Sequence, residues 1–247
     1  MSDVWYVCPG TKSGYYHYAQ CLLSEIQTEA LCLYVGPEGD HFSTTEKPLI
    51  VMTDSKIEAV TKSVIAVIGF LKSLLLNPPQ TVHVNSVVYS EPLTMLVLLA
   101  ARIRGVHTVW TLHEVPGDRY GSGPSPFWSA SLRIAHDIIV HHEQMVARIG
   151  RPAHVIPHGN YTIFDNMADA TETAEVTVLF PGDREYKGVD FFLDALSYVE
   201  SDPDYVLLGD VEHPDIRSVD GFLSDEELAR HYKNADIVVL PYRGGQT

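Results

Sequence analysis

Short apolar runs of the β type alternate with longer segments of helical period, and this alternation limits the fold more than any other feature. In the first part of the chain the runs lie at residues 4–8, 31–35, 49–52, 81–84, 107–112, 137–141 and 154–156. They are continuous in Val, Ile and Leu, as is typical of strands buried on both faces of a sheet. The segments between them include the expected helices 15–28, 55–76, 92–104 and 143–149. This order predicts a parallel sheet wound with helices on both sides.

The same pattern starts again after residue 175. Residues 176–180, 205–208 and 237–240 are expected strands, and residues 189–199 and 225–233 are expected helices. Ser224 followed by Glu227 is the signature of a capping box, which would open the second of these helices. The chain is therefore predicted to hold two consecutive doubly wound α/β units, of which the second is shorter.

The charge of the chain is distributed unevenly. The net charge is −15 at pH 7, and residues 161–247 hold 19 acidic and 6 basic side chains. The change in net charge along the chain predicts a boundary near residue 160, with domains at 1–160 and 161–247. A solvated acidic face kept for solubility explains the charge as well. Because clustered cations are lacking, we expect no binding of nucleic acid and at most a peripheral association with membranes.

Export and membrane insertion are not predicted. Residues 1–10 show no basic segment followed by an apolar one, so they do not resemble a signal peptide. The apolar stretch 64–76 is interrupted by Lys72 and is shorter than the roughly 20 residues needed to span a bilayer. The three cysteines form no Cys-x-x-Cys pair, which fits a reducing compartment. We expect a cytoplasmic protein.

The strongest local signal is the segment Phe-Pro-Gly-Asp-Arg-Glu-Tyr-Lys-Gly at residues 180–188, between an expected strand and an expected helix. Arg184 and Lys187 are the only cations within twenty residues on either side, in the strongly acidic part of the chain. A guanidinium and an ammonium near a helix N-terminus favour a diphosphate ligand. The alternative is a pair of surface ion pairs with Asp183 and Glu185.

The first loop, residues 9–14, joins an expected strand to an expected helix. It is not a Walker A loop, because Thr11 stands where that motif has the glycine before its lysine. Gly14 closes a glycine loop at the carboxyl edge of the predicted sheet, where open α/β sheets bind ligands. A tight turn that needs a positive φ explains the glycines equally well.

Histidines at strand ends are the remaining candidates. His113 follows the expected strand 107–112 and is placed either to hydrogen-bond a substrate or to serve a structural role. His136, His141, His142 and Glu143 resemble a metal site at first sight. Adjacent residues of a strand point to opposite faces, so His141 and His142 are unsuited to share one ion. We expect no metal.

Four segments together resemble the retaining, nucleotide-sugar-dependent glycosyltransferases of family 4. They are Ile-Pro-His-Gly-Asn-Tyr at 156–161, Arg-Glu-Tyr-Lys-Gly at 184–188, Gly-Phe-Leu-Ser-Asp-Glu-Glu-Leu at 221–228 and Ala-Asp-Ile-Val-Val-Leu-Pro-Tyr-Arg at 235–243. They occur in the order of that family and at compatible spacings. The resemblance runs along the whole chain and is most specific after residue 106.

This resemblance implies a GT-B fold, with two Rossmann-like domains that face each other across a cleft. The first domain would bind the acceptor and the second the nucleotide sugar. Arg184 and Lys187, with Gly14 and Gly182 at close approach, would bind the donor diphosphate. His113 would be the catalytic residue that contacts the donor sugar. Such enzymes transfer the sugar with retained configuration and generally need neither a metal nor another cofactor.

The resemblance also assigns two further regions. Leu223 and Asp225 would lie near the nucleotide base, and His158 and Gly159 would belong to the loop at the hinge and cleft. The residues do not specify the donor base, the donor sugar or the acceptor, which is a glycan, a lipid-linked molecule or a small molecule.

The chain departs from the family after Thr247, where family members continue into a helix with two glutamates. The second domain is therefore expected to be incomplete, with the apolar strand 237–240 uncovered and prone to association with itself or with a partner chain. We expect weak nucleotide-sugar binding and little transferase activity from such a truncated chain. The alternative is a non-catalytic GT-B-like binding or scaffold subunit completed by another chain. A nucleotide-sugar epimerase fits the Arg-x-x-Lys-Gly and Pro-Tyr-Arg segments less well.

Overall fold

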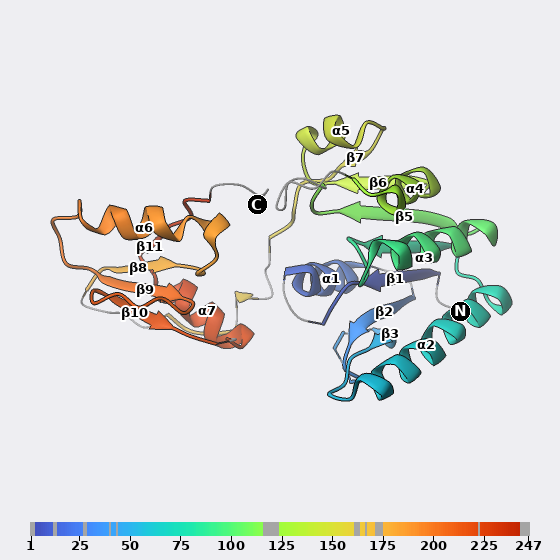
Figure 1. Ribbon diagram of the computed structural model, residues 1–247, viewed down its shortest axis with the longest axis horizontal. Helices are drawn as coiled ribbons and strands as arrows, with labels where there is room; N and C mark the ends of the chain where they lie inside the picture. The colour runs from blue at the N-terminus through green and yellow to red at the C-terminus, as the bar shows by residue number, and fades with distance from the viewer. Residues whose placement is uncertain are drawn as a thin grey trace. The chain divides into compact units, whose positions relative to one another are not determined.

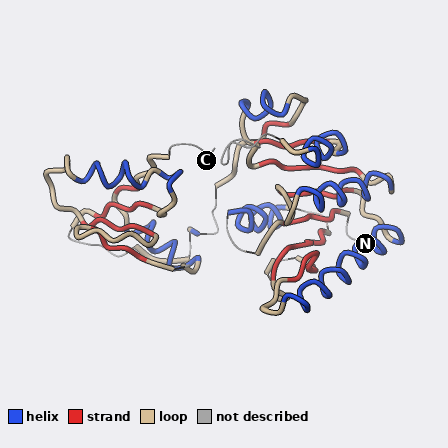
Figure 2. The backbone as a smooth tube through the Cα atoms, viewed as in Figure 1, coloured by secondary structure: helices blue, strands red, loops and turns tan. Residues whose placement is uncertain are grey.

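The computed structural model divides the chain into two compact units, Met1–Asn160 and Tyr161–Thr247 (Figure 1). Each unit is a parallel sheet with helices (Figure 2). The structure describes residues 3–11, 14–26, 29–39, 41–42, 44–115, 124–160, 164–165, 167–170, 175–221 and 223–242.

The first unit is built on a seven-stranded sheet in the order β3-β2-β1-β4-β5-β6-β7. All neighbouring strands pair in parallel, which confirms the predicted α/β class. The order 3-2-1-4-5-6 is that of the Rossmann fold, in which ligands bind at the carboxyl edge where the order reverses, here between β1 and β4. The strands are β1 Val4–Cys8, β2 Ala30–Gly36, β3 Thr45–Val51, β4 Thr81–Asn85, β5 His107–Leu112, β6 Asp137–Val140 and β7 His154–Val155.

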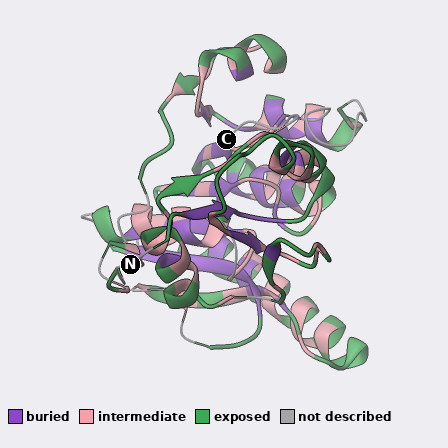
Figure 3. Ribbon diagram, turned by 90° about the vertical axis from the view of Figure 1, so that its left-hand side faces the viewer, coloured by how far each residue is buried: buried purple, intermediate pink, exposed green. Residues whose placement is uncertain are grey.

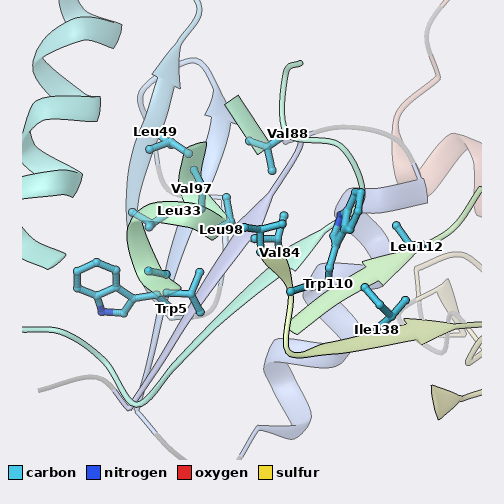
Figure 4. Packing of buried hydrophobic residues seen from close by; sticks show 14 of the residues in the cluster. Trp5, Leu33, Leu49, Val84, Val88, Val97, Leu98, Trp110, Leu112 and Ile138 are labelled. Atoms are coloured by element: carbon cyan, nitrogen blue, oxygen red, sulfur yellow. The ribbon is translucent and has the colours of Figure 1, made fainter. Parts of the chain in front are cut away.

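Helices cover both faces of this sheet. Side chains alternate along a strand, so Trp5 and Val7 of β1 enter the larger core, formed with α2, α3, α4 and α5 (Figure 4). Tyr6 and Cys8 point to the other face and pack against α1. Buried residues accordingly concentrate in the strands, and exposed ones on the outer sides of the helices (Figure 3). The helices are α1 Gly14–Glu25, α2 Lys56–Leu76, α3 Glu91–Ile103, α4 Pro126–Ile134 and α5 Glu143–Ile149.

Helix α2 has an apolar outer surface. Phe70 and Leu74 face the core, whereas Ile57, Ile65 and Leu76 are 83%, 64% and 65% exposed. By length and composition alone, α2 is the one helix among the described residues that meets the requirements for crossing a membrane, and 11% of its most apolar stretch is buried. Core helices of soluble proteins meet the same requirements, and α2 has a core-facing side.

The second unit repeats the beginning of this arrangement in a four-stranded parallel sheet of order β10-β9-β8-β11. Its core is apolar, with the rings of Phe180 and Phe192 stacked 4.7 Å apart. Ser224 and Glu227 form the predicted capping box at the start of α7. The elements are β8 Thr177–Phe180, the 3₁₀ helix η2 Glu185–Lys187, α6 Val189–Leu196, β9 Asp204–Leu208, β10 Ile216–Val219, α7 Asp225–Asn234 and β11 Ile237–Val238.

Helix α4, strand β10 and the 3₁₀ helix η2 were not predicted from the sequence, and the expected strand 237–240 is shortened by two residues. Helix α4 begins at Pro126, with Ser125 as its N-cap, inside a Gly/Ser/Pro-rich stretch of sequence that hid its start. Strand β10 has polar residues at its second and third positions and therefore lacks the apolar run of a buried strand. The expected strand 237–240 is reduced to β11, Ile237–Val238, where Ile237 is 51% exposed.

Leu98 offers a test of the larger core, because it is fully buried in α3 whereas Leu96 on the same helix is 41% exposed. We expect Leu98→Ala to lower the free energy of unfolding by about 2–5 kcal/mol through the cavity that it leaves. Leu96→Ala is the matched control and should change it by less than about 0.5 kcal/mol. Urea unfolding followed by tryptophan fluorescence reports on this unit alone, because Trp5, Trp110 and Trp128 all lie in it. Equal effects of the two substitutions would contradict the assigned burial.

Candidate functional site

The carboxyl edge of the first sheet gathers a cluster of histidines. His113 directly follows β5, His141 directly follows β6, and His158 lies in the segment after β7. Asn85, the last residue of β4, is completely buried beside them. Parallel strands bring their carboxyl ends to one edge, so residues far apart in sequence meet here.

Hydrogen bonds connect this cluster and fix its geometry. His113 Nε2 lies 2.7 Å from Asn85 Oδ1, and the Asn85 amide in turn donates to the Tyr15 carbonyl at 3.3 Å. His113 Nδ1 lies 3.2 Å from His141 Nε2. His141 Nδ1 donates to the Ile156 carbonyl at 2.9 Å. Each ring nitrogen of His113 and of His141 therefore lies within hydrogen-bonding distance of another polar atom of the first unit.

Tyrosine rings of α1 pack against the same histidines. The ring of Tyr18 lies 4.7 Å from that of His113, 5.5 Å from that of His141 and 5.1 Å from that of His158. Tyr15 meets His113 edge-on at 5.1 Å, and its hydroxyl donates to Glu114 at 3.2 Å. The N-terminal half of α1 therefore borders the histidine cluster.

His113 and His141 are neutral near pH 7. Burial, together with repulsion from His141, His158 and His83, lowers the pKa of His113 to about 3. Burial also lowers the pKa of His141, with contributions from His158 and His142. A neutral imidazole offers one N–H donor and one lone pair, so the cluster is suited to hydrogen bonding or to ligating an ion.

The carboxyl edge of the second sheet carries the loop predicted to bind phosphate. Gly182 has a φ of +130°, and a Cβ there would clash with the Lys187 ammonium. The ammonium donates to the Pro181 carbonyl at 2.5 Å, so Lys187 folds back across the glycine. Gly188 also has a positive φ of +77° and begins α6 as its N-cap. The glycines are thus required by the path of this loop.

Arg184 is exposed at the start of η2. Within the described part of the second unit it forms no ion pair with Asp183 or Glu185, the alternative that the sequence left open. Asp183 instead accepts a hydrogen bond from the Asp210 amide at 3.2 Å. The guanidinium of Arg184 is therefore not neutralised by either neighbouring carboxylate.

The other predicted site residues lie at the carboxyl edges of their own sheets. Gly14 is the first residue of α1, and Gly159 follows His158 beyond β7. In the second unit, Leu223 is half-buried after β10, and Asp225 opens α7. The structure brings His158 together with His113, and Gly182 together with Lys187.

Solved structures share this fold at low sequence identity. A UDP-GlcNAc 2-epimerase from Neisseria meningitidis bound to UDP-GlcNAc matches with a TM-score of 0.59 and 12% identity, over 95% of this chain and 76% of the other. A UDP-GlcNAc 2-epimerase from Methanocaldococcus jannaschii matches with a TM-score of 0.57 and 12% identity, over 95% and 77%. Alr3699/HepE of Anabaena, in complex with UDP, matches with a TM-score of 0.52 and 13% identity, over 84% and 60%.

The fold is that of GT-B-type, Rossmann-like proteins. No protein-family model matches the sequence, and no curated protein matches it. These identities are too low to carry a function across.

Sequence reasoning missed Asn85, Tyr18 and the pairing of His141 with His113. His113 was a candidate because it directly follows a strand. Asn85 at the end of β4 and His141 directly after β6 satisfy the same criterion. What the sequence does not show is that β4, β5 and β6 are neighbours. The histidines that looked clustered in sequence are separated, because His136 precedes β6 and bonds Thr108 whereas His141 follows β6.

His83 gives this region a testable pH dependence. Its Nε2 lies 2.7 Å from Thr111 Oγ1, and burial lowers its pKa to about 4. The unfolded chain, with an ordinary histidine pKa of about 6.5, binds this proton more readily, so stability falls as the pH drops from about 6.5 to 4. The full shift corresponds to about 3 kcal/mol, and we expect about 1–3 because the ring keeps partial contact with solvent.

His83→Gln keeps a polar side chain at this position but does not titrate. Urea unfolding between pH 4 and 7 measures the free energy of unfolding of both proteins. This free energy should change less with pH in the variant than in the wild type, and the two slopes should differ most between pH 4 and 6. Parallel stability curves for the two proteins would contradict the lowered pKa of His83.

Proposed function

We propose that this chain binds a nucleoside-diphosphate sugar and acts on it. The observation that carries the proposal is the loop after β8, where the Lys187 ammonium lies against the loop backbone and Arg184 is exposed. Among the described residues, Arg184 pairs with neither Asp183 nor Glu185. Two cations on a β–α loop at the carboxyl edge suit a diphosphate. The solved structures with UDP-GlcNAc and UDP bound support this ligand class.

The charge of the surrounding chain strengthens this assignment. Residues 161–247 carry a net charge of −13, which repels an anionic ligand from most of the unit's surface. Arg184 and Lys187 are the only cations between residues 164 and 207. A diphosphate is therefore directed to this loop. Leu223 and Asp225, at the same edge of the sheet after β10, are the residues that we assign to the nucleotide base.

The activity that we favour is transfer of the sugar to an acceptor with retained configuration, by resemblance to family 4. Arg184 and Lys187 would stabilise the charge of the leaving diphosphate, and Gly14 and Gly182 would allow its close approach. His113, being neutral, would act on the sugar as a hydrogen-bonding group rather than as a strong base. In this proposal the acceptor binds to the first unit.

A second candidate is epimerisation of a UDP-sugar, because two of the similar solved structures are UDP-GlcNAc 2-epimerases. A third is a binding or scaffold role without catalysis. Proton NMR of UDP-GlcNAc incubated with the protein alone separates these activities. Inversion at C2 of the sugar establishes epimerisation and contradicts the transferase proposal. Binding without turnover, even with a panel of acceptors, identifies the binding role.

The diphosphate assignment predicts the effect of removing its cations. We expect Arg184→Ala and Lys187→Ala each to weaken UDP binding by about 10- to 100-fold, as loss of a charge-assisted hydrogen bond requires. Isothermal titration calorimetry with UDP, GDP and ADP measures the effect and identifies the preferred base. Unchanged affinity in the double variant would rule out this loop as the diphosphate site.

Arg217→Ala is the matched control for these variants. Arg217 lies on β10 and pairs with Asp204, the first residue of β9, at the opposite end of the strands. The substitution changes the net charge by the same amount without touching the loop. We expect it to leave the UDP affinity within about twofold, since a screened surface charge contributes little.

Substitution of His113 should separate the contribution of the sugar to the binding affinity from that of the nucleotide. We expect His113→Ala to leave the affinity for UDP unchanged, because the diphosphate cations lie in the other unit. The additional affinity of a UDP-sugar over UDP should be reduced. Calorimetry with UDP and UDP-GlcNAc measures both quantities, and an equal loss for the two ligands would assign His113 a structural role.

A further inference from the structure

We propose that His113, His141 and His158 form a binding site for a divalent transition-metal ion, with Zn²⁺ as its first occupant. One ring nitrogen of each residue lies within 4.8 Å of those of the other two. All three residues belong to the first unit, so the site does not depend on the nucleotide-sugar proposal. Neutral imidazole is a preferred ligand of zinc and its neighbours in the first transition series.

Hydrogen bonds to oxygen atoms determine where each ring carries its proton. A carbonyl oxygen only accepts, so His141 Nδ1, which faces the Ile156 carbonyl at 2.9 Å, must carry a hydrogen. The Asn85 amide nitrogen donates to the Tyr15 carbonyl, which turns Asn85 Oδ1 toward His113 Nε2. His113 Nε2 therefore also carries a hydrogen. In the same way, the Gly159 carbonyl 3.1 Å from His158 Nδ1 selects the tautomer with its lone pair on Nε2.

These tautomers direct two lone pairs at each other. His113 Nδ1 and His141 Nε2 are both left without hydrogen in the neutral rings, yet they lie only 3.2 Å apart. Two acceptors at this distance repel unless a cation lies between them. Tetrahedral zinc with Zn–N bonds of about 2.0–2.1 Å holds its nitrogens about 3.3–3.4 Å apart. The observed separation is thus close to that of two ligands on one zinc ion.

A shared proton is the alternative way to relieve this repulsion. It would make one ring an imidazolium in a partly buried cluster of other histidines. Zn²⁺ competes with this proton for the same two lone pairs, so binding of Zn²⁺ in calorimetry distinguishes the two cases. A metal ion differs from a proton because it draws on the lone pairs of several rings at once.

The surroundings resemble the supporting shell of a metal site. Ligating histidines usually donate their second N–H to a carbonyl or carboxylate, which orients the ring. Here Asn85, Ile156 and Gly159 provide those oxygens. Tyr18 packs its ring against all three histidines and limits their rotation. The two inner ligands are therefore held in place before an ion arrives.

The third ligand leaves the site open on one side. His113 and His141 are half-buried, whereas His158 is exposed and lies in the segment after β7. Because His113 and His141 are already 3.2 Å apart, the wider separations in the trio involve His158, which would close onto the ion. Three protein ligands leave a fourth position for water or an oxygen of a bound molecule, as in catalytic zinc sites.

A metal ion at the trio differs from the expectation of no metal. That expectation rested on the resemblance to family 4 and on the histidines near residue 140, of which His141 alone belongs to the trio. An ion in the trio would occupy Nδ1 of His113. A sugar oxygen would then bind to the open coordination position of the ion and would not hydrogen-bond to the His113 ring.

The test is direct metal binding to the intact chain. We expect the protein stripped with EDTA to bind one equivalent of Zn²⁺ in calorimetry, and the Co²⁺-loaded protein to show the intense visible absorption of four-coordinate cobalt. His158→Ala and His141→Ala should each weaken Zn²⁺ binding by about 10- to 100-fold or more. His158 is exposed, so its variant should melt at the temperature of the metal-free wild type, which keeps the test valid if His141→Ala is unstable.

His142→Ala is the matched control, since it removes a neighbouring histidine that is not in the trio. It should bind Zn²⁺ like the wild type. No binding by the wild type at 10-fold excess Zn²⁺ overturns the proposal. Equal affinity in all variants, or a loss in His142→Ala as large as in His158→Ala, overturns it as well. UDP titration of the same samples is independent of these outcomes and tests the nucleotide proposal separately.

Discussion

The parallel pairing of β1 with β2 on one side and β4 on the other is the constraint on which the first unit depends. A central strand must bury both faces, so Trp5 and Tyr6 enter different cores and helices are needed on both sides. Strands that run in one direction also end at one edge. His113 therefore meets Asn85 and His141, each 28 residues away in sequence, without any local motif.

Much of this architecture could be predicted, because it follows from local patterns. The capping box at Ser224 and the strand 107–112 were recognised from residue types alone and are confirmed. Strand β10 could not be recognised, since its middle residues are polar and its pairing with β9 decides its conformation. The histidine cluster escaped prediction for the same reason. Its members are selected by the order of β4, β5, β6 and β7, which is a tertiary property.

The two sheet edges offer different chemistry to a ligand. In the first unit the edge carries histidine rings, of which His113 and His141 are neutral and have their lone pairs and N–H groups set by hydrogen bonding. In the second unit the edge carries two full positive charges, Arg184 and Lys187, on an acidic background. Neutral nitrogens are suited to a cation, and clustered cations are suited to a diphosphate. The same fold thus carries complementary preferences in its two halves.

The state of His113 depends on the backbone of α1 rather than on a charged neighbour. The Tyr15 carbonyl in the first turn of α1 accepts from the Asn85 amide and so turns Asn85 Oδ1 toward His113. This oxygen requires a hydrogen on Nε2, which leaves the lone pair on Nδ1 facing His141. The position of the Tyr15 carbonyl in α1 thus determines which atom of His113 is available. A carboxylate in place of Asn85 would orient the same ring, but it would raise the pKa of His113, so that a proton would compete with an ion for Nδ1. The amide at the end of β4 orients His113 without adding that charge.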